Sequence, residues 1–141
     1  MFGPDSRILI VDDQPPLRGL LRSQLRALKM GANPENHKEA NDGVEGFSKL
    51  EQAHLVKLPI DLIISDWEMP NMSGLDFLKK VRADERFKAT PFLLLTAKNQ
   101  ADNVLKAMES GASNYMLKPF SIAVLKDKLE RVWQTHHGKA K

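Results

Sequence analysis

Three carboxylates in the sequence come directly after apolar runs. Asp12 and Asp13 follow residues 8–11, and Asp66 closes a second run that begins at residue 62. A charge at the end of a buried strand is costly unless another group pairs with it. Two like charges about 4 Å apart repel by about 4 kcal/mol at an effective dielectric of about 20, so three acids brought together would need cations. We expect a hard divalent ion, Mg²⁺, because the set offers only oxygen ligands and lacks the histidine or cysteine that favours zinc.

Two further polar residues follow apolar runs later in the chain. Thr96 follows residues 92–95, and Lys118 follows residues 115–117. A carboxylate beside Mg²⁺, an ammonium and a hydroxyl is a phosphoryl-acceptor site, in which Asp66 would attack phosphorus in line. Each feature alone has a simpler interpretation, since an Asp-Asp pair is most often a helix N-cap. The functional interpretation depends on their joint placement at successive strand ends.

The elements that must position these residues alternate along the chain. We expect strands at residues 8–11, 37–40, 62–65, 92–95 and 115–117, each followed by a stretch whose apolar residues have helical spacing. The first helix is expected to begin at Pro16, because a proline disfavours helical angles in the residue before it. Apolar strands of this kind are covered on both faces, which predicts an α/β fold with a parallel sheet between helices. The carboxyl ends then share one edge, to which every strand except the second delivers a polar group.

Composition limits the possible classes of protein. The 141 residues carry a formal net charge of +3 and contain no cysteine, which predicts one cytoplasmic domain over residues 1–141 without disulfides. No apolar stretch is long enough for a membrane helix, and the first residues lack the apolar region of a signal peptide. The basic residues are interspersed with acids except near the last residues, so we expect neither nucleic acid nor membrane as a partner.

Four segments resemble the signature segments of response-regulator receiver domains, in particular those of single-domain chemotaxis members. The segments are ILIVDDQ, LIISDWEMPNMSGLDFLKKVR, LLLTAK and GASNYMLKPF, and the likeness covers about residues 5–136. The resemblance implies a flavodoxin-like, doubly wound sheet of five strands in the order 2-1-3-4-5, with five helices. It also implies that Asp66 is the phosphoacceptor and that the metal site comprises Asp12, Asp13, Asp66 and the backbone carbonyl of Glu68, with Asp13 and Asp66 as direct ligands.

Further residue roles follow from the same resemblance. Lys118 resembles the phosphate-binding lysine, and the bond between Lys118 and Pro119 is expected to be cis. Thr96 and Tyr115 resemble the switch residues, whose positions change together on phosphorylation. In the family the positions of Glu68 and Lys98 flank the path of the hydrolytic water. We hypothesise that these two residues form an ion pair that tunes the phosphate lifetime.

The resemblance also implies partners. A histidine kinase would donate the phosphoryl group, and phosphorylation would remodel the face formed by the fourth helix, fifth strand and fifth helix. Chemotaxis members use that face to bind the flagellar motor switch. The protein would then be a binding module, and not an enzyme beyond its own phosphorylation and dephosphorylation. Two alternatives stay open: a phosphorelay intermediate or phosphate sink that passes the group to a histidine protein and, more remotely, a phosphatase with an aspartyl nucleophile.

Overall fold

A computed structural model describes residues 1–31, 33–97 and 101–137. Within these ranges the strands are β1 (Ile8–Val11), β2 (His37–Ala40), β3 (Leu62–Asp66), β4 (Phe92–Thr96) and β5 (Asn114–Leu117). The helices are α1 (Pro15–Ala27), α2 (Gly43–Leu55), α3 (Gly74–Ala83), α4 (Ala101–Glu109) and α5 (Ile122–His137), and a short 3₁₀ helix, Pro34–Asn36, precedes β2. No helix in the described ranges is long and apolar enough to cross a membrane.

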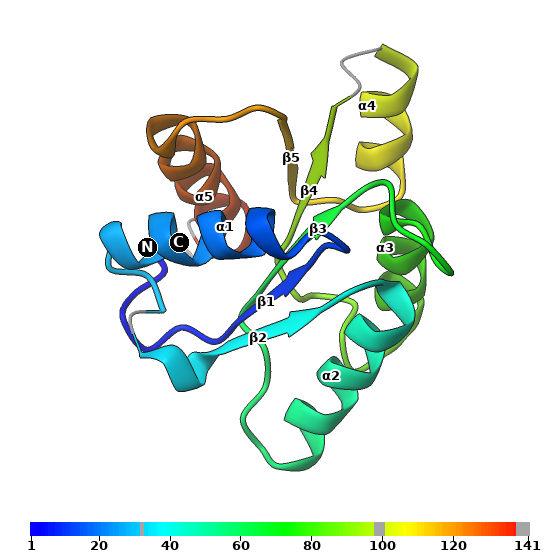
Figure 1. Cartoon of the computed structure of the whole chain (residues 1–141). Helices are drawn as coiled ribbons and strands as arrows, with labels where there is room; N and C mark the ends of the chain where they lie inside the picture. Colours follow the sequence, from blue (N-terminus) through cyan, green and yellow to red (C-terminus); the bar gives the residue numbers. More distant parts are fainter. Residues whose placement is uncertain (32, 98–100, 138–141) are drawn as a thin grey trace.

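The five strands form a parallel sheet in the order β2-β1-β3-β4-β5, so the predicted fold class and strand order are confirmed. The register places Val11 beside Ala40 on one side and beside Ser65 on the other. β1 and β3 therefore end next to each other in the middle of the sheet (Figure 1). The strand order changes direction at this point, and sheets of this type bind ligands there.

Alternate residues of the central strands point to opposite faces, and each face carries its own hydrophobic core. Leu9 and Val11 pack with buried residues of α2, α3 and α4. Ile8 and Ile10 pack with buried residues of α1 and α5. Figure 1 shows α1 and α5 together on one side of the sheet, with α2 and α3 on the other. Because helices cover both faces, a polar site has to lie at an edge of the sheet.

The first helix begins one residue earlier than the sequence predicted. Pro15, and not Pro16, is the first residue of α1, and Gln14 is the N-cap residue. The expectation was wrong because N–H groups in the first helical turn have no partner inside the helix, so both prolines can occupy that turn. The carbonyl of Gln14 accepts hydrogen bonds from the N–H groups of Leu17 and Arg18, which starts the helix directly after the first two acids.

The start of α3 lies very close to the end of β3. Ser73 caps α3 by accepting a hydrogen bond from the N–H of Asp76. The N–H of Gly74 donates to the carbonyl of Trp67 at 2.7 Å. A Cβ atom at position 74 would lie 1.9 Å from the carbonyl oxygen of Asp66, so only glycine permits this approach. The loop between β3 and α3 is therefore closed at its base.

Candidate functional site

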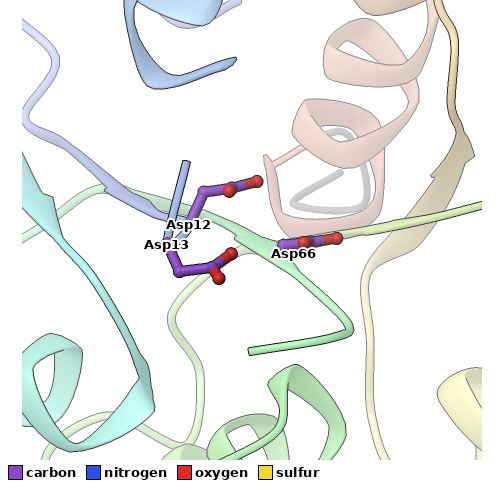
Figure 2. A group of neighbouring side chains, drawn as sticks. All are labelled: Asp12, Asp13 and Asp66. Atoms are coloured by element: carbon purple, nitrogen blue, oxygen red, sulfur yellow. The ribbon is translucent and has the colours of Figure 1, made fainter. Parts of the chain in front are cut away.

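The carboxylates of Asp12, Asp13 and Asp66 gather at the carboxyl edge of the sheet. One oxygen of each lies within 4.8 Å of an oxygen of the other two. Figure 2 shows the pair from the end of β1 next to Asp66 from the end of β3. Asp12 and Asp66 are 1% and 5% exposed, whereas Asp13 is exposed to solvent. The structure thus brings together the three acids from which the sequence predicted a metal site.

Asp12 lies in an environment that disfavours its charge. Burial is the main cause that raises the pKa of Asp12 from 3.8 to about 6, and the charges of Asp66 and Asp13 raise this pKa further. The N–H of Gln14 donates to Asp12 Oδ1 at 2.8 Å and opposes the shift. In the described part of the chain, Asp12 Oδ2 is buried without a hydrogen-bond partner. A buried carboxylate oxygen without a donor is costly, and a bound cation would remove this cost.

Asp66 is in direct contact with the ammonium of Lys118, which acts on Asp12 only through its charge among the described residues. Burial raises the pKa of Asp66, and the hydrogen bond and charge of Lys118 are the main opposing influences. The Nζ atom of Lys118 lies 2.9 Å from Asp66 Oδ1. The N–H of Trp67 donates to the same oxygen at 2.9 Å. The lysine that follows β5 therefore reaches across β4 to the acid at the end of β3.

A cavity of about 290 Å³ lies over this group, lined by Asp13, Gln14, Asp66, Trp67, Glu68, Ala97 and Lys118. The residues fit a hard divalent cation such as Mg²⁺, because the acids supply oxygen ligands and Asp12 Oδ2 has no donor among the described residues. Glu68, whose backbone carbonyl is a predicted ligand, lines the same cavity. The site therefore combines a concentration of negative charge, room for a small group, and the ammonium of Lys118.

Thr96 and Lys118 end neighbouring strands. Thr96 closes β4 and is 3% exposed. Its carbonyl accepts a hydrogen bond from the N–H of Lys118 at 2.9 Å, which fixes the start of the loop after β5 against the end of β4. The bond between Lys118 and Pro119 is cis, as the resemblance implied. Thr96 therefore ends the strand next to that of Asp66, and Lys118 follows the strand beyond it.

Two other predicted residues are Tyr115, which is not among the described residues that line the cavity, and Lys98. Tyr115 on β5 is half-buried, and the Nζ atom of Lys128 on α5 lies 4.7 Å from the centroid of its ring. Lys98, the hypothesised partner of Glu68, lies outside the described residues. The ion pair between them therefore stays a hypothesis.

The second strand contributes to this edge, so the expectation that it delivers no polar group is wrong. Asp42 follows β2, is 9% exposed, and accepts hydrogen bonds from the N–H of Glu45 and from Nδ2 of Asn71. No local pattern in the sequence marks Asp42, because its partner Asn71 lies 29 residues away. Asp42 is not one of the clustered acids, and it binds the loop that follows Asp66.

Arg18 of α1 is a second residue that the sequence analysis did not identify. Its guanidinium donates to the carbonyl of Asp12 and to Oε1 of Glu39 at 2.8 Å. Arg22, one helical turn later, pairs with the other oxygen of Glu39. These bonds attach α1 to the backbone of Asp12 and to β2. No local pattern could have revealed them, because they join three separate elements.

Comparisons with known proteins agree with this geometry. Residues 8–130 match the family described as response regulator receiver domain. The chain is 37% identical to chemotaxis protein CheY of Pseudomonas aeruginosa over 132 residues, which cover 94% of this chain and 99% of that protein. It is 38% identical to chemotaxis protein CheY-3 of Vibrio cholerae over 134 residues, which cover 95% and 96%.

A solved structure shows the same likeness. The chemotaxis response regulator CheY4 of Vibrio cholerae matches with a TM-score of 0.77 and 31% identity, over 90% of this chain and 98% of that one. The match to the family covers all five strands and most of α5. The family assignment therefore rests on the sequence, the strand order and the acids at the carboxyl edge together, and the chain belongs to the response regulator receiver domain family.

Proposed function

We propose that this chain is a chemotaxis signalling switch, in which a histidine kinase phosphorylates Asp66 in the presence of Mg²⁺. The observation that carries the proposal is the acid cluster within 4.8 Å, in which Asp66 is also paired with Lys118. Such a cluster needs a cation, and the ammonium is placed to meet the oxygens of an incoming phosphoryl group. Similarity to two proteins named for chemotaxis supports the choice of pathway.

Asp66 acts as the nucleophile. An oxygen of its carboxylate bonds to phosphorus while the bond between phosphorus and the donor imidazole nitrogen breaks, and the electron pair leaves with that nitrogen. Lys118 holds a phosphoryl oxygen, since its ammonium already lies 2.9 Å from Asp66 Oδ1. The Thr96 hydroxyl donates a hydrogen bond to another phosphoryl oxygen. Each residue thereby offsets charge that the transferred group brings to a buried position.

The metal would be held by Asp13, Asp66 and the carbonyl of Glu68, with Asp12 beside them. When bound, Mg²⁺ neutralises the negative charge shared by these acids and the phosphoryl oxygens. Asp12 then remains ionised at neutral pH although burial raises its pKa to about 6 in the absence of a cation. The acids therefore hold the cation, and they also keep the site from accepting a phosphoryl group without it.

The output is a protein contact through the face formed by α4, β5 and α5. Several large apolar side chains are exposed on these elements, namely Leu105, Met108, Leu117, Ile122 and Val124. Tyr115 lies on β5, where it is half-buried and close to Lys128 of α5. A change in the position of its side chain would therefore alter this face. Phosphorylation shifts an equilibrium between two arrangements of the face, which requires that a partner bind them with different affinity. By similarity to the chemotaxis proteins, the partner is the flagellar motor switch.

The phosphate lifetime is set by the residues that border the cavity. Glu68 lines the cavity, and we retain the hypothesis that it pairs with Lys98 across the entrance. Such a pair would affect the access of water far more than the stability of the fold. Comparing autodephosphorylation rates of the wild type, Glu68→Asn and Lys98→Glu tests this idea, and equal rates in all three would exclude it.

The phosphoacceptor is tested with a small-molecule phosphodonor and intact-mass spectrometry. The folded wild type should gain one phosphoryl group only with Mg²⁺, and Asp66→Asn, which keeps the side-chain shape, should gain none. An Asp66→Asn variant that is modified like the wild type would refute the proposal.

The output is tested with a motor-switch peptide. Binding should strengthen when a beryllofluoride phosphate mimic and Mg²⁺ are added, with Trp67 fluorescence reporting that the mimic has bound. Transfer of the group to a histidine protein without any binding of the peptide would point to a phosphorelay intermediate or a phosphate sink instead.

A further inference from the structure

The edge strand β2 supplies none of the clustered acids, yet the residue that follows it holds the loop beside them. Asp42 Oδ1 accepts a hydrogen bond from the N–H of Glu45 at 2.9 Å, as the N-cap of α2. Asp42 Oδ2 accepts a second bond from Nδ2 of Asn71 at 2.7 Å. These two bonds lower the pKa of Asp42, so the carboxylate is ionised at neutral pH. The residue is 9% exposed, which limits competition from water for both bonds.

Asn71 lies at the turn of the loop that joins Asp66 to α3. Its φ angle of 66° places it in the left-handed region, which few residues other than glycine and asparagine adopt. The N–H of Met72 donates to the carbonyl of Pro70 at 2.6 Å, which makes the turn tight. The side chain of Asn71 thereby points away from its own loop and toward the start of α2. There Nδ2 of Asn71 donates a hydrogen bond to the N-cap residue, Asp42.

A second contact joins the same two segments. A Cβ atom on Gly43, the residue after Asp42, would lie 2.8 Å from Sδ of Met72, the residue after Asn71. The backbone at the start of α2 therefore packs directly on the loop. Together with the bond from Gly74 to Trp67, these contacts fix the loop at its base and at its turn.

We propose that Asp42 and Asn71 are positioning residues for the divalent cation, because they hold the segment that carries the carbonyl of Glu68. Glu68 lines the cavity and lies between the fixed base of the loop and the fixed turn at Asn71, so its backbone has little freedom to move away from the acids. Preorganised ligands bind a metal more tightly than ligands that must first be ordered. This inference rests on the proposed function, since it assumes that the acid cluster binds Mg²⁺.

The test compares Mg²⁺ affinity in variants that remove this bond and leave the local backbone intact. Asn71→Gly keeps the left-handed conformation accessible, and Asp42→Ser keeps an N-cap oxygen but cannot reach Asn71. Titration with MgCl₂, followed by Trp67 fluorescence, should show affinity about tenfold weaker in each variant. The double variant should resemble the single variants, because both remove the same interaction. Melting temperature without metal verifies that each variant is folded, and Asn71→Gly alone is decisive if Asp42→Ser fails to fold.

Asp84→Ser is the matched control, because Asp84 also accepts a backbone N–H and pairs with a side chain, Arg86, but does so after α3. Its Mg²⁺ affinity should equal that of the wild type. Affinity within twofold of the wild type in both Asn71→Gly and Asp42→Ser would overturn the positioning role while leaving the proposed function intact. A wild type that binds no Mg²⁺ would instead refute the proposed function on which this inference rests.

Discussion

The amino and carboxyl edges of the sheet differ in whether the fold supplies partners for their charged groups. At the amino edge, the guanidinium of Arg82 donates to the carbonyls of Gly111 and Thr90 at 2.8 and 2.7 Å. At the carboxyl edge, Asp12 has one buried oxygen with no donor in the described part of the chain, and like charges beside it. The fold itself supplies acceptors for the guanidinium of Arg82. The carboxylate of Asp12 instead requires a cation from solution to offset its charge.

Ser113 and His136 at the amino edge are paired in the same manner. Ser113 accepts a hydrogen bond from the N–H of Phe92 at 3.0 Å, and its hydroxyl lies 2.5 Å from Nε2 of His136. These contacts join the starts of β4 and β5 to the last turns of α5. They stabilise the fold without providing a group that is available for binding.

The difference separates two tasks of the same sheet. The amino edge holds elements together, and the carboxyl edge retains an unfavourable arrangement of charge that a cation can relieve. Sites of this kind lower the stability of the free protein because function requires them. Substitutions at the amino edge should therefore lower stability without affecting Mg²⁺ binding. Substitutions of the acids at the carboxyl edge should raise the stability of the metal-free protein and weaken Mg²⁺ binding.

The largest effect is expected for Arg82→Met at the amino edge. The variant leaves two half-buried carbonyls without their donor, so the free energy of unfolding should fall by about 2 to 4 kcal/mol. Urea unfolding followed by circular dichroism measures this change. Mg²⁺ affinity of the folded protein should not change, and a parallel loss of affinity would mean that the two edges are not independent.

The second-largest effect is a gain in the free energy of unfolding, which we expect for Asp12→Asn. Because a pKa raised from 3.8 to about 6 reflects a disfavoured charge, the variant without metal should be more stable at neutral pH by up to about 3 kcal/mol. Calorimetry in the presence of a chelator measures the gain. The same variant should lose most of its stabilisation by Mg²⁺, so a metal response equal to that of the wild type would contradict the assignment.

The pH dependence of the metal-free wild type should reveal the same charge. Folded Asp12 binds its proton more tightly than the unfolded chain does, so its contribution to stability is present below pH 3.8 and is lost as pH rises through about 6. The difference in unfolding free energy between Asp12→Asn and the wild type should therefore grow between these pH values. Saturating Mg²⁺ should lower the pKa of folded Asp12 and so flatten the profile between these pH values. A wild type whose stability increases relative to that of the variant as pH rises would exclude this view of Asp12.

A smaller loss is expected for Ser113→Ala at the amino edge. The variant leaves the buried N–H of Phe92 without an acceptor, which should cost about 1 to 2 kcal/mol. Thermal unfolding measures the loss, and the phosphorylation rate of the folded variant should equal that of the wild type. A change in that rate would extend the influence of the amino edge to the chemistry.

The smallest effect sets the baseline for both edges. Asp127 and Arg131 form an ion pair within α5, and their side chains are 54% and 66% exposed. Asp127→Asn should therefore change stability by less than about 0.5 kcal/mol. A larger change in urea unfolding would show that exposed ion pairs affect the free energy of unfolding as much as the pairing of buried groups does.

The sequence predicted the fold and the acids because both depend on short-range patterns. Apolar runs ending in Asp12–Asp13 and in Asp66 mark strands and their polar ends at once, and the geometry of parallel sheets brings those ends together. The strand order came from the resemblance to receiver domains and not from the apolar pattern. The switch roles of Thr96 and Tyr115 came from that resemblance too, and they stay predictions.

The parts that the sequence missed depend on contacts between distant segments. Asp42 and Asn71 lie 29 residues apart, and each taken alone is an ordinary turn residue. Arg82 lies on α3, and its hydrogen-bond partners, Thr90 and Gly111, lie in two later loops. The start of α1 at Pro15 was missed for a local reason. A residue before a proline disfavours helical angles but can still adopt them, as Pro15 does.

The close approach of Gly74 to the carbonyl of Asp66 has a consequence for how sequences of this fold can diverge. In a library randomised over residues 73–75, selection for folding alone would return glycine at position 74, since any Cβ would collide with the backbone of the preceding strand. Position 73 would admit other capping residues. Invariance at 74 would therefore report backbone crowding, although the position adjoins the phosphoacceptor closely enough to be mistaken for part of its chemistry.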